Sequence, residues 1–308
     1  MDIQTVLSTI IVMGLMIATG SIFAMKVNVT SEVKSVLILL ILNIAVPAVI
    51  LNGVFSVDLT GGALAEAGMI FGISIVYHLA ALVLVGVAAY LLRLRSVFAK
   101  KMMILGALGN TGFIGIPLAA AIFGPAGGFL AAIFDAGLSL TVYTIVIYLL
   151  QAEGKFHIRQ LKAVINMPVG AIVIGILAAV SGFQPPGMMI QFVEMLAALA
   201  APMAMLYVGM LLPPLLKKKR EIFFPELWFP LSFRLMVIPL LMMLILQLFS
   251  FTGWTAQLIV IQTAMPTAMI TAVLFSKFTS EEETAVVTIF ASTLLSLITI
   301  PFIAWLMI

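Results

Sequence analysis

Ten apolar stretches, each of about 20 residues or more, fill almost the whole chain and constrain its fold more than any other feature. A helix needs about 20 apolar residues to cross the hydrocarbon core of a bilayer. Of the 308 residues, 64% are apolar and 9% are charged, whereas a soluble domain carries about 25% charged residues. We therefore predict an all-α polytopic membrane protein with ten transmembrane helices, at residues 5–25, 34–55, 63–91, 101–123, 127–150, 161–181, 188–212, 226–250, 255–276 and 284–307.

Charge is distributed unequally between the loops that connect these stretches. Every lysine and arginine except Arg234 follows an odd-numbered stretch, whereas the other loops carry acids such as Asp2 and Asp58. The positive-inside rule then places the basic loops in the cytoplasm and both termini outside. We expect a multi-pass protein of the plasma membrane, the inner membrane of a bacterial cell. The basic residues are Lys26, Lys34, Arg93, Arg95, Lys100, Lys101, Lys155, Arg159, Lys162, Lys217, Lys218, Lys219, Arg220 and Lys277.

Two of the apolar stretches are interrupted near their middle. Residues 109–117 contain three glycines and end at Pro117, and residues 262–267 contain Pro266. Glycine weakens a helix, and proline removes an amide donor and clashes with the preceding turn. Backbone groups freed in this way are tolerated at membrane depth only where protein or a water-filled cavity satisfies them. Paired interruptions in the two halves of a chain indicate the binding site of a transporter.

Polar residues at and near the interruptions are the candidate substrate ligands. An asparagine offers a donor and an acceptor, and a threonine offers a hydroxyl, so each could hold a carboxylate or stabilise the opened backbone. We expect the prolines to keep the breaks open. The candidates are Asn110, Thr111, Gly112, Gly115, Pro117, Gln262, Thr263, Pro266 and Thr267, with Asn43 and Asn52 from the second stretch.

Weak internal similarity indicates a 5+5 inverted repeat. The second stretch carries Pro47 followed by Gly53, and the seventh carries Pro202 followed by Gly209. With five helices in each half, the second half enters the membrane from the opposite side. We predict residues 1–150 as the first five-helix repeat and residues 151–308 as the second, with substrate bound where the two interrupted helices, the fourth and the ninth, cross.

The same residues resemble the auxin efflux carrier family, which includes plant PIN carriers and bacterial permeases for malonate, malate and oxalate. The resemblance covers essentially the whole chain and rests on Asn110-Thr111-Gly112…Gly115…Pro117, Pro266, Arg234 with Pro239, and Asn43-Ile44-Ala45-Val46-Pro47. It implies a fold similar to sodium/proton antiporters and bile acid symporters. Helices 1, 2, 6 and 7 would form a scaffold, and helices 3–5 and 8–10 a mobile transport domain. The implied function is secondary transport of a small organic anion, a mono- or dicarboxylate or an auxin-like acid, by alternating access.

Two charged residues lie deep within predicted spans, where such residues are costly and usually functional. Asp135 could carry a proton, bind Na+ or form a structural ion pair. Arg234 could pair with Asp135, attract the anion, or snorkel to the interface. A double-aspartate motif is absent because Ala136 follows Asp135.

Other classes of function lack support in the sequence. No phosphate-binding loop or His-Glu-x-x-His motif occurs, and the chain contains no cysteine and two histidines. We expect no enzyme activity, no cofactor and no nucleic-acid partner, but coupling to Na+ or H+ remains open. A symporter or antiporter of the bile acid symporter type is the alternative function, and a channel or receptor is a weaker one. Membrane lipids and a small organic anion are the expected partners. Uniport, transport direction and a homodimer stay open, as does the identity of the acid.

Overall fold

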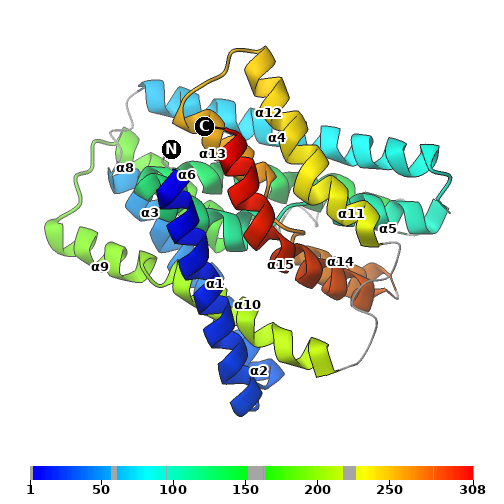
Figure 1. Cartoon of the computed structure of the whole chain (residues 1–308). Helices are drawn as coiled ribbons and strands as arrows, with labels where there is room; N and C mark the ends of the chain where they lie inside the picture. The colour runs from blue at the N-terminus through cyan, green and yellow to red at the C-terminus, as the bar shows by residue number, and fades with distance from the viewer. Residues whose placement is uncertain are drawn as a thin grey trace. The chain divides into compact units, whose positions relative to one another are not determined.

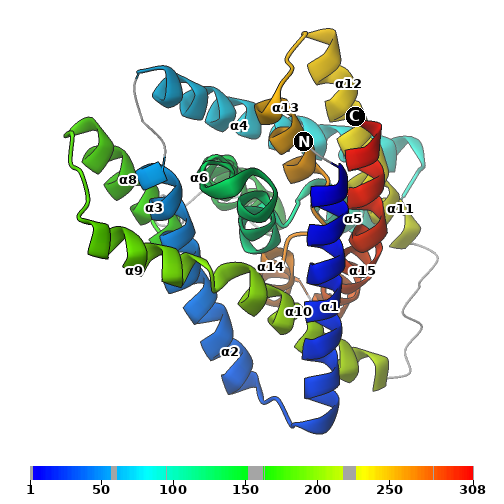
Figure 2. The same cartoon turned by 60° about the vertical axis from the view of Figure 1, so that its left-hand side comes forward.

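The computed structural model describes residues 3–56, 61–94, 96–151, 162, 164–217, 227–279 and 281–307, and the regular elements within these ranges are helices (Figures 1 and 2). An all-α fold is therefore confirmed for this part of the chain. The structure describes only some of the charged residues on which the predicted asymmetry between loops rests. The charged residues that lie outside the described ranges are Asp2, Asp58, Arg95, Lys155, Arg159, Lys218, Lys219 and Arg220.

Helices long and apolar enough to cross a bilayer account for much of the described chain. Within the described ranges there are seven such runs: Gln4–Lys26, Glu32–Ser56, Gly62–Leu91, Thr111–Leu150, Gly187–Pro213, Trp228–Leu248 and Glu282–Leu306. The run of 40 residues from Thr111 contains Gly124, whose φ of 73° and ψ of −171° are not helical. This glycine and Pro125 lie in the gap predicted between the fourth and fifth spans. The chain is thus a multi-pass membrane protein, and the count of ten spans remains a prediction.

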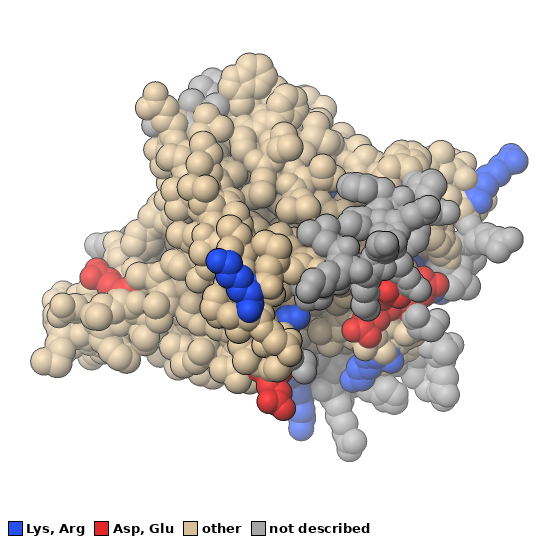
Figure 3. Space-filling model, turned by 60° about the horizontal axis from the view of Figure 1, so that its bottom comes forward, with Lys and Arg blue, Asp and Glu red and all other residues tan. Residues whose placement is uncertain are grey.

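The surface of these helices fits a lipid environment. On α4 (Gly61–Leu91), Val76, Val83 and Tyr90 are 68%, 65% and 80% exposed and recur every seven residues. Such spacing places them along one face of a helix. Uncharged residues also cover most of the face shown in Figure 3. Exposed apolar stripes of this kind are what a helix presents to acyl chains.

Three of the longer helices widen by one π-helical turn shortly before a proline. The turns Ile41–Ala45, Thr111–Gly115 and Phe233–Val237 each end two residues before the proline, and the prolines are Pro47, Pro117 and Pro239. A proline ring clashes with the carbonyl of the preceding turn and leaves it without its amide partner. A wider turn accommodates that clash, and π turns are frequent at functional sites.

One compact unit comprises Met1–Ile70, Gly112–Ile133 and Ile165–Arg220. It contains the beginnings of α4 and of α6 (Ile116–Thr141), together with α1 (Ile3–Lys26), α2 (Ser31–Leu40), α3 (Val46–Ser56), α8 (Met167–Val180), α9 (Gly187–Ala197) and α10 (Ala200–Lys217). Helices α1 and α10 approach closely through two glycines. A β-carbon on Gly20 would lie 2.2 Å from the Leu206 carbonyl oxygen, and one on Gly209 would lie 2.1 Å from that of Ile17. Small residues at such crossings allow membrane helices to pack backbone to backbone.

Replacing Gly20 with leucine should lower the thermal stability of the purified protein, because the new side chain would collide with backbone atoms of α10. Overpacking of this kind costs about 1–3 kcal/mol. Gly14→Leu is the matched control, since a β-carbon at that position of the same helix meets nothing within 4 Å. Equal unfolding temperatures for the two variants would contradict the close approach of α1 and α10.

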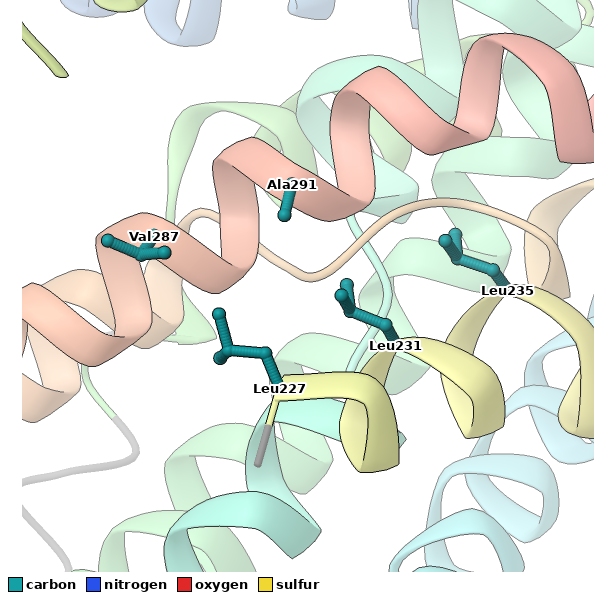
Figure 4. Close-up of a cluster of buried hydrophobic side chains, with 5 residues drawn as sticks. All are labelled: Leu227, Leu231, Leu235, Val287 and Ala291. Carbon is teal, nitrogen blue, oxygen red and sulfur yellow. The ribbon is translucent and has the colours of Figure 1, made fainter. Parts of the chain in front are cut away.

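The second compact unit comprises Phe71–Thr111, Phe134–Val164 and Glu221–Ile308. It contains the remainders of α4 and α6 with α5 (Ser96–Ala107), α7 (Ile147–Leu150), α11 (Trp228–Ser232), α12 (Ile238–Leu248), α13 (Trp254–Thr263), α14 (Ile270–Phe278) and α15 (Glu282–Leu306). Part of its core is a cluster in which Leu227, Leu231 and Leu235 face Val287 and Ala291 of α15 (Figure 4). The spacing of four residues puts the three leucines on one helix face. This packing holds the segment that carries Arg234.

Candidate functional site

The two interruptions predicted from glycine and proline are present, and they pair with each other. Helix α5 ends at Ala107 and α13 ends at Thr263. Beyond them, Gly109 and Thr267 form an isolated antiparallel β-bridge. The Asn110 amide donates to the Pro266 carbonyl over 2.7 Å, and the Ala268 amide donates to the Leu108 carbonyl over 3.0 Å. Each segment thus satisfies backbone groups that the other segment has freed.

Thr267 connects the paired segments to α5 and α15 through hydrogen bonds. Its hydroxyl donates to the Leu105 carbonyl in α5 over 3.1 Å. Its amide donates to the hydroxyl of Ser292 in α15 over 3.0 Å. Both polar groups of this fully buried residue therefore bond to protein. We infer a bracing role for Thr267 where the sequence suggested a substrate ligand.

Arg234 lies against the carboxyl ends of both interrupted helices. It is completely buried. Its guanidinium donates from Nη1 to the Ala107 carbonyl over 2.7 Å and from Nη2 to the Thr263 carbonyl. These oxygens belong to the last residues of α5 and α13, where carbonyls lack an intrahelical partner and the helix dipole is negative. A β-carbon on Gly109 would lie 3.3 Å from the Arg234 guanidinium carbon, so the glycine gives the cation room.

The snorkelling alternative for Arg234 is wrong, because the side chain is 0% exposed. The pairing alternative also lacks support. Among the described residues the ion pair is Lys101 with Glu281, at 2.9 Å, and the two Nη groups of Arg234 donate to carbonyl and hydroxyl oxygens. A guanidinium has several donors in a fixed planar arrangement, which suits two carbonyl groups from different helices.

Asp135 bonds to the first residue after the break in α5. The Thr111 hydroxyl donates to Oδ1 of Asp135 over 2.6 Å. The carboxylate is partly buried in α6 and, within the described part of the chain, has no basic side chain at ion-pairing distance. The structure therefore joins two predicted site residues, Thr111 and Asp135, and leaves the carboxylate available for a proton or a cation.

Buried polar atoms without a hydrogen-bond partner occur in both interrupted segments. They are Nδ2 of Asn110 and both Oε1 and Nε2 of Gln262, in side chains that are 4% and 0% exposed. Leaving such an atom unsatisfied costs about 1–3 kcal/mol, so each one requires an explanation. A ligand that forms hydrogen bonds with these amides would explain why they have no partner within the protein. Thr263, by contrast, donates its hydroxyl to the Val260 carbonyl over 2.8 Å and faces its own helix.

The remaining predicted site residues belong to the first unit. Gly112 and Gly115 lie in the π-helical turn Thr111–Gly115, and Pro117 lies in the first turn of α6. Asn43 lies in the turn Ile41–Ala45, and Asn52 in α3 has an unpartnered buried Oδ1. Their part in substrate binding stays a prediction.

The sequence did not identify Tyr77 and Ser74, two residues of α4 that support the site. Tyr77 accepts a hydrogen bond from Arg234 Nη2 over 2.7 Å. One turn earlier, the Ser74 hydroxyl donates to the Phe134 carbonyl of α6. His78 is buried, with its ring centroid 4.6 Å from that of Tyr77, in keeping with a packing role. Polar residues at positions i, i+3 and i+4 of an otherwise apolar helix were the available signal.

The arrangement defines a class of protein: a multi-pass membrane protein with a polar, fully buried pairing of two interrupted helices. Residues 5–304 match the family model described as membrane transport protein. The chain therefore belongs to the membrane transport protein family, the auxin efflux carrier family that its motifs resemble.

Two archaeal proteins named as uncharacterised transporters are similar to it. The protein of Methanothermobacter thermautotrophicus is 27% identical over 303 residues, which cover 97% of this chain and 96% of that protein. The protein of Methanocaldococcus jannaschii is 26% identical over 238 residues, covering 72% and 75% of the two chains.

Proposed function

We propose that the protein is a secondary carrier of a small organic anion, a mono- or dicarboxylate, across the plasma membrane by alternating access. The observation that carries the proposal is the paired break at Gly109 and Thr267, flanked by the unpartnered amides of Asn110 and Gln262. Amide groups can donate to a carboxylate without adding a formal charge to the membrane interior. In the proposal, ten helices form two inverted repeats with both termini outside the cell.

The charge around the break supports an anionic substrate. Arg234 already occupies the carbonyl ends of α5 and α13. A second cation at those carbonyls would meet a resident positive charge. An anion would instead be attracted by the guanidinium and by the amide ends of the helical segments that follow the break. Members of a transporter family with this electrostatic pattern are expected to select carboxylates over amines.

Coupling to a cation is the second candidate, and the contact between Thr111 and Asp135 favours it. A carboxylate next to an anion site repels the substrate unless it is protonated or holds a cation. A proton or Na+ at Asp135 would remove that repulsion and would link substrate binding to an ion gradient. Uniport is the outcome expected if Asp135 is only structural.

The test is uptake into proteoliposomes across a panel of carboxylates, with sodium and proton gradients varied independently. Saturable uptake, accelerated by the same acid on the far side, would identify a carrier. Uptake proportional to concentration, without such acceleration, would identify a channel and overturn the proposal.

Replacing Asn110 or Gln262 with alanine should lower uptake about tenfold or more, because a hydrogen bond to a charged ligand contributes about 1.5–3 kcal/mol. Thermal stability should stay the same or rise, since each change removes a buried polar atom that has no partner. Thr299→Val is the matched control, because its unpartnered hydroxyl lies in α15 and outside the interrupted segments. Normal uptake by both alanine variants would exclude these amides from the substrate site.

A further inference from the structure

A cavity of about 740 Å³ lies where α4 ends and α5 begins. Its walls come from the last turns of α4, the connection that follows, and the first turns of α5. Gly86 of α4 and Met103 of α5 meet on one side, where a β-carbon on the glycine would come within 2.9 Å of the Met103 sulfur. The volume falls in the range of about 300–1,000 Å³ that is usual for ligand pockets.

Two cations, Arg93 and Lys100, line this cavity. Among the described residues, neither has a carboxylate within ion-pairing distance, whereas the adjacent Lys101 is paired with Glu281 at 2.9 Å. The cavity is therefore positively charged and lacks an internal counter-ion in the described part of the chain. Its ligand should carry negative charge.

Arg93 occupies a backbone conformation that arginine seldom adopts. Its φ is +54°, and the Leu94 amide donates to the Ala89 carbonyl over 3.0 Å, as at the end of a helix closed by a left-handed residue. Glycine is the usual residue at that position because it has no β-carbon. An arginine kept in a strained position at a charged cavity indicates a use for its side chain.

The cavity also borders the exposed stripe of α4 that Val76, Val83 and Tyr90 form. Tyr90 and Leu91 line it and are 80% and 71% exposed. Tyr90 continues the stripe formed by Val76 and Val83. Tyrosine at the end of a spanning helix is typical of the membrane interface. A soluble anion would bind the two cations but leave the apolar wall of the cavity exposed to water. A lipid would contact both the cations, through its headgroup, and the apolar wall, through an acyl chain.

We propose that this cavity binds the phosphate headgroup of an anionic phospholipid, with Arg93 and Lys100 holding the phosphate and an acyl chain lying along α4 beside Tyr90 and Leu91. The loop after α4 is among those expected on the cytoplasmic side, where anionic lipids attract basic segments. The site is separate from the transport site and does not depend on the substrate.

Native mass spectrometry of the purified protein with added phosphatidylglycerol or phosphatidylcholine tests the proposal. We expect retained phosphatidylglycerol in the wild type, and about 25-fold weaker retention in the double variant Arg93→Gly with Lys100→Gln, since each interfacial basic residue contributes about a fivefold change. Arg93→Gly relieves the backbone strain, so the variant should fold and melt no lower than the wild type. Arg93→Lys should keep most of the binding.

The matched control is Lys26→Gln with Lys34→Gln, which removes the same charge from the last residue of α1 and the first turn of α2. The proposal is overturned if the control loses as much phosphatidylglycerol as the cavity variant, if the cavity variant binds like the wild type, or if phosphatidylcholine is retained equally. Displacement of the lipid by millimolar inorganic phosphate would also overturn it, because the site would then recognise a free anion.

Discussion

Arg234→Met should unfold at a clearly lower temperature than the wild type and should not transport. The substitution keeps an apolar stem of similar length but removes the donors to the carbonyls of Ala107 and Thr263 and to the Tyr77 hydroxyl. Each buried acceptor left without a partner costs about 1–3 kcal/mol. The combined cost for the three acceptors, roughly 3–9 kcal/mol, is a large part of a typical stability of about 5–15 kcal/mol.

Thermal unfolding in detergent and uptake in proteoliposomes together measure this effect. Arg234→Lys should be intermediate, because a single ammonium group cannot reproduce the planar arrangement of donors. Lys277→Met is the matched control: Lys277 lies exposed at the end of α14 and contacts the Phe278 ring at 5.5 Å. Wild-type stability and transport in Arg234→Met would show that the two helix ends do not need the cation.

Asp135→Asn should abolish accumulation driven by an ion gradient while leaving exchange of labelled substrate across the membrane. The asparagine retains a carbonyl oxygen that can accept from Thr111, so local packing is conserved, but it can neither release a proton nor neutralise a sodium ion. We expect the dependence of uptake on pH or sodium to disappear, with a fall of about tenfold or more in accumulation, because each 1.4 kcal/mol of lost coupling is a factor of ten.

Counterflow assays with and without imposed gradients separate the two activities of Asp135→Asn. Glu194→Gln provides the control, since Glu194 lies on the exposed side of α9. Accumulation equal to that of the wild type under every gradient would exclude Asp135 from coupling and favour uniport. Loss of exchange together with accumulation would instead make Asp135 part of the substrate site.

Local chemistry explains which features could be predicted. Glycine and proline act on their own turn of helix, so the interruptions near residues 110 and 265 and the turn at Gly124 were readable from the sequence. The apolar stretches likewise predicted an all-helical membrane protein. These signals need no knowledge of which segments become neighbours.

Contacts between distant residues could not be predicted in the same way. Arg234 is 127 residues from Ala107 and 29 from Thr263 along the chain. Nothing in a single sequence indicates that these two carbonyls converge on one guanidinium, so the sequence leaves three alternatives for Arg234, and bonding to helix ends is not among them. The sequence likewise suggests Thr267 only as a substrate ligand, because its bonds to Leu105 and Ser292 depend on the tertiary fold. The roles of Arg234 and Thr267 depend on which residues surround them in the folded protein, and the neighbouring sequence does not determine this.

The shared guanidinium also limits how the protein can change shape. Drawing α5 away from α13 would leave Arg234 without one or both of its carbonyl partners, and bonds to a charged group contribute about 1.5–3 kcal/mol each. A state with both bonds broken would be occupied by only about one molecule in a hundred to one in ten thousand. Any working cycle should therefore carry the two broken segments together as one rigid piece, with the hinges located elsewhere in the chain.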